Sequence, residues 1–134
     1  MKNIVVILIM VLFVFACAED NVKMDLDVNQ ELDFEGAFRT KGSDENLFEE
    51  VTLKIANGFY ETTTSLPFGY GAGKLEVFGS SISFIDTLFF PIPALYGPSY
   101  VLSGTHNFEF NGKELKIWSE KNVGAIEYNL RLKE

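Results

Sequence analysis

The chain has very little of the chemistry that metal and redox sites need. It contains one cysteine, Cys17, and one histidine, His106, among 134 residues. A single cysteine excludes an internal disulfide, a zinc cluster built on cysteines and a dithiol redox pair. The sequence therefore predicts a domain that is held together by its hydrophobic core alone, with no metal and no cofactor.

Positive charge is also scarce. The chain has 11 lysines and arginines against 19 aspartates and glutamates, which gives a formal net charge of −8. Binding to nucleic acid depends largely on cationic side chains that displace counterions from phosphates, and an acidic protein is likewise repelled by anionic lipid head groups. We therefore expect no nucleic-acid partner, and surface charge does not explain any attachment to a membrane.

No apolar run is long enough to span a membrane. Residues 4–15 are twelve residues without a polar side chain, whereas a helix needs about 20 residues to cross a hydrocarbon layer about 30 Å thick. Lys2 precedes this run, and the small residue Ala16 follows it. This layout is typical of an export signal, so residues 1–16 are predicted to form a signal peptide.

The end of the predicted signal carries a more specific pattern. Val14-Phe15-Ala16-Cys17 resembles the lipobox of bacterial lipoproteins, in which a branched apolar residue, a loosely specified residue and a small residue precede a cysteine. The resemblance implies a mature chain that begins at Cys17 and is anchored in the membrane by two or more acyl chains. The alternative is an ordinary secretory signal that is cleaved nearby, with Cys17 incidental.

The residues after Cys17 are polar and acidic. Glu19 and Asp20 resemble the surface-export signals of lipoproteins from Bacteroidota-type bacteria, so the expected location is the outer membrane of the cell envelope, on its periplasmic or its surface side. Residues 17–31 have too little apolar surface to offset the entropy lost on ordering, and they are predicted to form a flexible tether. Apolar residues alternate from Val22 to Val28, which makes a loose edge strand the alternative for part of this stretch.

From Leu32 onward the sequence alternates with a period of two, which is typical of half-buried strands. Asn57-Gly58 lies between two such runs and predicts a two-residue hairpin turn, because a type I′ turn needs positive φ at both central residues. Gly79-Ser80 predicts a second such turn. The expected cross-strand neighbours are Ile55 with Tyr60 and Val77 with Ile82.

A third hairpin is predicted at Asn111-Gly112. A strict two-residue turn would place Glu109 opposite Glu114, which is unfavourable, so a bulge or a longer loop is the alternative. Residues 126–132 form the longest clean alternation, and we expect this final strand to pair with the first at Phe34. Residues 32–134 are therefore predicted to be all-β, with about eight antiparallel strands closing into a small barrel, or alternatively a β-sandwich.

The order of these features is similar to that of small outer-membrane lipoproteins of Bacteroidota-type bacteria with a lipocalin-like barrel. The features are the Asn-Gly hairpins, a glycine-rich corner, an apolar proline-rich stretch and the sequence of residues 96–105. Gly36-Ala37-Phe38 stands where lipocalins have Gly-x-Trp. The resemblance implies a lipocalin-like fold and a role in binding a small apolar or amphipathic molecule.

The glycine-rich residues 68–74 do not form a phosphate-binding loop. Phe68 stands where that loop needs its first glycine, and Leu75 stands where a serine or threonine must follow the Gly-Lys pair. We interpret the glycines as a bend or a close approach of two backbones at a barrel corner.

The residue inventory predicts no enzymatic activity. His106 shares a predicted strand face with Phe108 and Phe110, whereas Ser103 and Thr105 lie on the opposite face. A single histidine on an apolar face is typically a hydrogen-bonded core or rim residue. The sequence also contains no nucleophile elbow and no His-Glu metal motif.

Residues 88–99 hold three of the four prolines and are mostly apolar. Proline removes a backbone donor, so this stretch cannot be an interior strand, yet it is unusually apolar for a loop. It is interpreted as a lid over a small apolar ligand, a docking surface for an envelope protein, or a plug for the barrel end. A cavity above about 300 Å³ beneath it would favour the first. The candidate contact residues are Phe89, Phe90, Ile92, Leu95, Tyr96, Tyr100 and His106.

Overall fold

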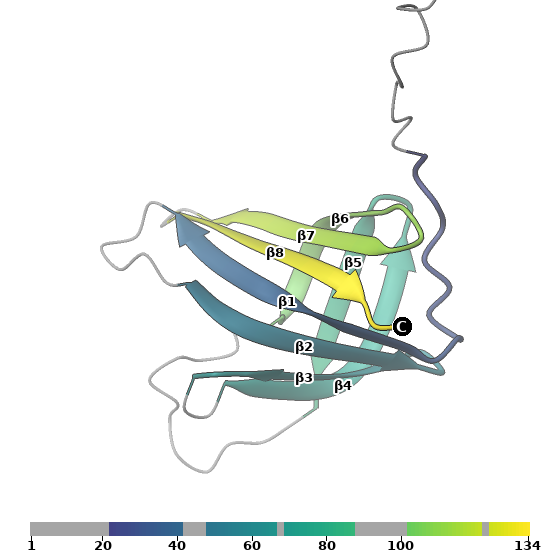
Figure 1. Cartoon of the computed structure of the whole chain (residues 1–134), viewed down its shortest axis with the longest axis horizontal. Coiled ribbons are helices and arrows are strands. Elements are labelled where there is room, and N and C mark those ends of the chain that lie inside the picture. Colours follow the sequence, from purple (N-terminus) through teal and green to yellow (C-terminus); the bar gives the residue numbers. More distant parts are fainter. Residues whose placement is uncertain (1–21, 42–47, 67–68, 88–101, 122–123) are drawn as a thin grey trace, which may run out of the picture.

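The structure is a computed structural model that describes residues 22–41, 48–66, 69–87, 102–121 and 124–134 (Figure 1). The strands are β1 Leu32–Lys41, β2 Phe48–Ala56, β3 Phe59–Thr64, β4 Tyr70–Phe78, β5 Ser81–Asp86, β6 Gly104–Phe110, β7 Glu114–Lys121 and β8 Gly124–Leu132. In the described part of the chain, no helix has the length and apolar character needed to cross a membrane.

The eight strands form a closed antiparallel barrel in which each strand pairs with its neighbours in sequence. The ring closes between β1 and β8, where Phe34 lies opposite Leu132 and Phe38 lies opposite Tyr128. This confirms the predicted all-β barrel and its predicted closure at Phe34, and it excludes the β-sandwich. Closure leaves none of these strands with an unpaired edge.

The first two hairpins have the predicted registers. Ile55 lies opposite Tyr60 in β2–β3, and Val77 lies opposite Ile82 in β4–β5. Asn57 and Gly58 both have positive φ (52° and 76°), as a type I′ turn requires. The pattern of alternation and the turn residues therefore specify the same pairing, which is why both registers could be predicted.

The third hairpin differs from the strict two-residue prediction, which is wrong; its longer-loop alternative is correct. Phe110 pairs with Leu115, so Glu109 lies opposite Lys116 rather than opposite Glu114. The Asn111 side-chain oxygen accepts hydrogen bonds from the backbone N–H groups of residues 113 and 114, at 3.0 and 2.7 Å. These bonds lengthen the loop and shift the register by two residues. Such a shift keeps every side chain on its predicted face and replaces a like-charge pair with an opposite-charge pair.

The two ends of the barrel are built differently (Figure 1). The hairpin end, on the right of the figure, carries the turns at residues 57–58, 79–80 and 111–113 together with the C-terminus. The loop end is the end at which β1, β3, β5 and β7 finish and β2, β4, β6 and β8 begin.

Residues 22–31, here called the N-terminal segment, run along the hairpin end (Figure 1). The Met24 N–H donates to the Phe110 carbonyl (2.8 Å), and the Gly58 N–H donates to the Val28 carbonyl (2.9 Å). Leu26 is buried in the core. These contacts are not those of a solvated tether, and in this described part the chain does not form the alternative edge strand either.

The barrel interior is divided into an apolar half and a partly polar half. Near the hairpin end the buried side chains are apolar, and they include Phe34, Leu53, Ile55, Leu75, Leu115 and Leu130. Among the residues that the structure describes, four buried residues are polar, and all four lie toward the loop end: Thr40, Thr62, His106 and Ser119. Residues 22–134 contain all eight strands, the ring closure and this core, so we expect this part of the chain to fold on its own.

The glycine-rich corner is explained by close packing, as predicted. A Cβ at Gly73 would collide with the backbone carbonyl of Ile85 on the neighbouring strand. A Cβ at Gly71 would instead meet only side chains, the nearest being the Thr62 methyl group at 3.3 Å. Glycine at position 73 therefore permits a close approach of β4 and β5 that any other residue would prevent.

Candidate functional site

Most of the sequence-predicted contact residues lie outside the described part of the chain. These are Cys17, the predicted lipidation site, and Phe89, Phe90, Ile92, Leu95, Tyr96 and Tyr100 of the proline-rich stretch. Only His106 can be placed. The end of the same connection is described from Leu102 onward, and it shows how the chain returns to the barrel.

His106 lies inside the barrel on β6, on the same face as Phe108 and Phe110, as predicted. Its Nε2–H donates a hydrogen bond to the Ser103 carbonyl (2.9 Å). Its ring also packs edge-on against those of Phe84 and Tyr128, with centroids 5.9 and 6.2 Å apart. These contacts give His106 a structural role in the core, because they fix residue 103 to the interior.

Tyr128 holds the adjacent residue in the same way. Its hydroxyl accepts a hydrogen bond from the backbone N–H of Leu102 (3.1 Å). Leu102 is fully buried, although its φ of +20° is one that leucine rarely adopts. Burial raises the pKa of the Tyr128 hydroxyl, and the Leu102 hydrogen bond offsets part of this rise. The end of the long connection is therefore inserted into the barrel and secured there.

A row of five rings crosses the barrel interior, from Tyr60 near the hairpin end to Phe38 near the loop end. Tyr60 contacts Phe84 (4.9 Å between centroids), Phe84 contacts His106, His106 contacts Tyr128, and Tyr128 contacts Phe38 (5.4 Å). All four of these ring contacts are edge-on or tilted rather than stacked face to face, which is the favoured geometry for aromatic packing. With Leu102 added, this part of the interior is occupied by side chains.

Tyr60 differs from Tyr128 in one respect. Its side chain is 1% exposed, yet its hydroxyl has no hydrogen-bond partner among the described residues. Burial, and secondarily the nearby charge of Asp86, raise the pKa of this hydroxyl. Asp86 and the Tyr60 ring lie 3.6 and 3.7 Å from the position that a Cβ would take at Gly71, so the space at Gly71 is the size of one methyl group.

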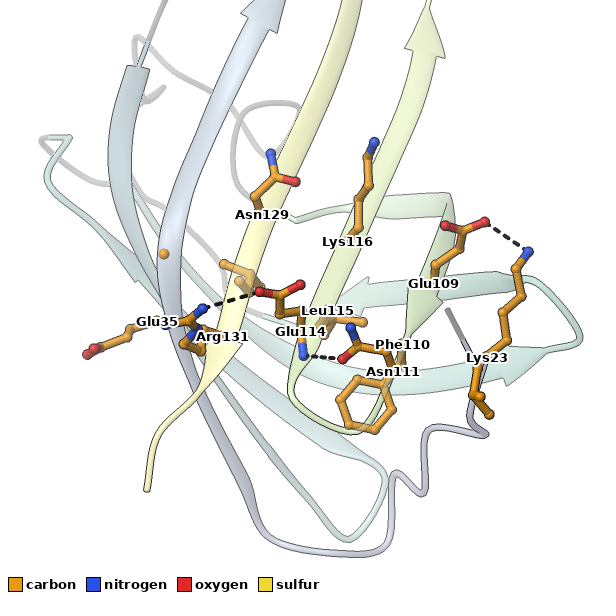
Figure 2. A pocket seen from close by; sticks show the side chains of 13 residues that line it. Lys23, Glu35, Glu109, Phe110, Asn111, Glu114, Leu115, Lys116, Asn129 and Arg131 are labelled. Carbon is orange, nitrogen blue, oxygen red and sulfur yellow. Dashed lines mark hydrogen bonds and ion pairs between the residues drawn. The ribbon is translucent and has the colours of Figure 1, made fainter. Parts of the chain in front are cut away.

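A larger space lies on the outside of the barrel near the hairpin end (Figure 2). This outer groove has a volume of about 470 Å³ and lies over β1, β8, β7 and β6, with the N-terminal segment on one side. Its lining residues are Val22, Lys23, Glu35, Gly36, Glu109, Phe110, Asn111, Glu114, Leu115, Lys116, Asn129, Leu130 and Arg131.

The outer groove combines apolar side chains with a charged rim. Val22, which is 62% exposed, supplies its apolar part, together with the aliphatic stems of the long charged side chains. Phe110, Leu115 and Leu130 also border the groove, but their side chains are at most 8% exposed and belong to the barrel core. Strand alternation places the charged side chains of the four strands outward around these residues. The groove is therefore amphipathic, with charge at its edges.

Two ion pairs mark opposite sides of the groove (Figure 2). Lys23 of the N-terminal segment lies 2.8 Å from Glu109 on β6, and Arg131 on β8 lies 3.3 Å from Glu114 on β7. The hydrogen bond from Lys23, with the charge of Lys23 and of Lys116, lowers the pKa of Glu109. This carboxylate therefore remains a charged group of the rim at neutral pH.

Sequence reasoning missed the outer groove, because its lining comes from five separate segments. Two features of the sequence could have indicated it. One is the polar face of the β7–β8 hairpin, and the other is the alternation of apolar residues from Val22 to Val28, which is compatible with an N-terminal segment that lies against the barrel. The contact of Lys23 with Glu109 depends on that docking and leaves no local sequence pattern.

Among the residues that the structure describes, no three histidine, cysteine, aspartate or glutamate side chains are grouped in a way that could hold a metal ion. No protein-family model, curated protein or solved structure matches this chain. The groove and the interior must therefore be interpreted from their own chemistry.

Proposed function

We propose that this protein is a non-catalytic binding protein of the cell envelope, anchored through lipid at Cys17, whose barrel binds a small amphipathic molecule in the outer groove. The observation that carries the proposal is the groove itself, with a volume of about 470 Å³, the exposed apolar side chain of Val22 and a charged rim. Sites for small molecules in proteins have volumes of roughly 300–1,000 Å³, a mainly apolar lining and a few polar groups.

The proposed site differs in position from the one expected beneath residues 88–100. The described interior is filled by the ring row and by Leu102, which leaves an outer rather than an inner site for a ligand of this size. Eight-stranded barrels can be either filled or hollow, so the fold is compatible with this arrangement.

The proposal is non-catalytic because the groups that normally perform acid–base chemistry have structural roles here. The imidazole of His106 is enclosed by aromatic rings and bonded to the Ser103 carbonyl. The groove contains carboxylates and cations, but the two shortest contacts among them join opposite charges on its rim.

Intrinsic fluorescence gives a direct test of binding. Trp118 is the only tryptophan of the chain and lies on β7 beside the groove, with the Lys116 ammonium 5.7 Å from its ring centre. Residues 22–134 are titrated with decyl maltoside below its micelle concentration. We expect a saturable change of Trp118 emission, and its absence with this and with charged decyl amphiphiles would refute the proposal.

Two exposed apolar residues provide a matched pair of variants. Val22 lines the groove and is 62% exposed, whereas Phe78 lies on β4 outside the groove and is 67% exposed. Val22→Asp should weaken binding roughly fivefold, through the loss of about 1 kcal/mol of apolar contact. Phe78→Asp should leave binding unchanged.

Anchoring is tested separately. Growth with an alkyne-bearing fatty acid should label the wild-type chain and should not label a Cys17→Ser chain. Equal labelling of the two chains would contradict lipidation at Cys17, but it would leave the binding proposal untouched.

A further inference from the structure

The rim of the outer groove is electrically balanced in a chain that is strongly acidic overall. Six charged residues line the groove, namely Lys23, Lys116, Arg131, Glu35, Glu109 and Glu114. Three are cations and three are anions, whereas the whole chain has a formal charge of −8. The groove thus lacks the acidic excess that would favour a cationic ligand, and it also lacks the basic excess that an anionic ligand would need.

The charges of the rim are separated into two pairs rather than mixed at one point. Figure 2 shows Lys23 with Glu109 on one side and Arg131 with Glu114 on the other, with Phe110 and Leu115 in between. A molecule lying in the groove between the two pairs would therefore meet one cation and one anion at each side.

These ion pairs can change partners at little cost. The side chains of Lys23 and Glu109 are 73% and 47% exposed, and those of Arg131 and Glu114 are more exposed still. Exposed ion pairs contribute little to stability, because water and salt screen them and two long side chains lose freedom. A ligand that offers both a cation and an anion can replace such a pair without leaving either side chain unpaired.

We propose that the ligand of the outer groove is a zwitterionic amphiphile, a molecule with a phosphate and an ammonium group joined to an alkyl chain. This inference rests on the proposed function and specifies its ligand class. The phosphate would take the place of a carboxylate beside Lys23 or Arg131, and the ammonium would take the place of a cation beside Glu109 or Glu114. The alkyl chain would lie against Val22 and the aliphatic stems of the long charged side chains.

The test compares four amphiphiles with the same decyl chain, each below its micelle concentration, on residues 22–134. The head groups are phosphocholine, maltoside, phosphate and trimethylammonium, and the readout is Trp118 emission. Thermal unfolding of each variant first confirms that it is folded. We expect decylphosphocholine to bind at least about tenfold more tightly than each of the other three.

Two double variants show whether the rim provides this preference. Lys23→Met with Glu109→Gln should remove most of the preference for phosphocholine over maltoside. Lys54→Met with Glu61→Gln is the control, because these two residues form an opposite-charge pair across β2 and β3 outside the groove. The control should keep the preference.

The outcomes separate the two proposals. Binding of all four amphiphiles with equal affinity would overturn the zwitterion inference and leave the binding function standing. Retention of the phosphocholine preference in the Lys23/Glu109 variant would also overturn it, since the rim would not be the origin of the preference. Failure of all four to bind would refute the proposed function itself.

Discussion

Removing the side-chain hydroxyl should change the stability of the fold in opposite directions at two buried tyrosines, Tyr128 and Tyr60. Tyr128→Phe removes the hydroxyl that accepts the Leu102 N–H, and so leaves a buried backbone donor without this partner. An orphaned buried donor costs about 1–3 kcal/mol. For a domain of this size, a loss of about 2 kcal/mol lowers the melting temperature by roughly 6 °C.

Tyr60→Phe removes a hydroxyl that has no described partner. A buried polar group without a hydrogen bond is itself destabilising, so its removal should stabilise the fold by about 1 kcal/mol, or roughly 3 °C in melting temperature. The ring remains, together with its edge-on contact to Phe84. The two variants therefore differ only in whether the deleted hydroxyl was satisfied.

The assay is thermal and urea unfolding of residues 22–134, followed by circular dichroism, for the wild type and both variants. Hydrogen exchange of the Leu102 amide gives a local measurement. This amide should exchange faster in Tyr128→Phe than in the wild type, and at the wild-type rate in Tyr60→Phe. Equal changes of melting temperature in the two variants, or a larger loss of stability in Tyr60→Phe, would refute the reasoning from hydrogen-bond satisfaction.

Three further predictions follow from the same structure. The pKa values of Tyr60 and Tyr128 are raised in the folded state. The stability of the fold should therefore be full below about pH 10, the pKa of an unfolded tyrosine, and should fall above it by up to about 1.4 kcal/mol per pH unit for each tyrosine. Urea unfolding measured from pH 8 to 11 should show a shallower fall in stability for Tyr128→Phe than for the wild type. Gly73→Ala should destabilise the fold by about 3 kcal/mol or more, because its Cβ collides with the Ile85 carbonyl. Gly71→Ala should be nearly neutral, because its Cβ meets only side chains. Equal melting temperatures of the two variants would contradict this. Leu26→Ala should cost about 2–3 kcal/mol, as a buried core residue does, while an exposed tether would give no change in urea unfolding.

The strand order and most of the registers could be predicted from the sequence, because three local signals agreed. Alternation identified which faces are buried, Asn57-Gly58 and Gly79-Ser80 fixed two turns, and the apolar face of residues 126–132 indicated closure onto β1. The third register needed one more fact, the capture of two backbone N–H groups by Asn111. An asparagine before a glycine permits both a two-residue turn and this longer loop, so the sequence alone left them open.

The outer groove and the insertion of Leu102 could not be predicted, for a different reason. Both depend on segments distant in sequence, since Lys23 reaches Glu109 and Leu102 reaches Tyr128. The low hydrophobicity of residues 19–31 indicated a tether, but one buried leucine and two backbone hydrogen bonds are enough to dock such a segment. Averages over a window do not reveal contacts of this kind.

The docking of the N-terminal segment also determines how the barrel would carry mechanical load. Tension applied upstream of Val22 reaches the barrel first through the Met24 and Val28 backbone hydrogen bonds and through the buried Leu26, before any strand of the ring is strained. Two hydrogen bonds loaded one after the other yield more easily than a closed ladder. The segment would therefore peel away before the barrel opened. Because it forms one side of the outer groove, such tension would take apart the groove while the fold stayed intact.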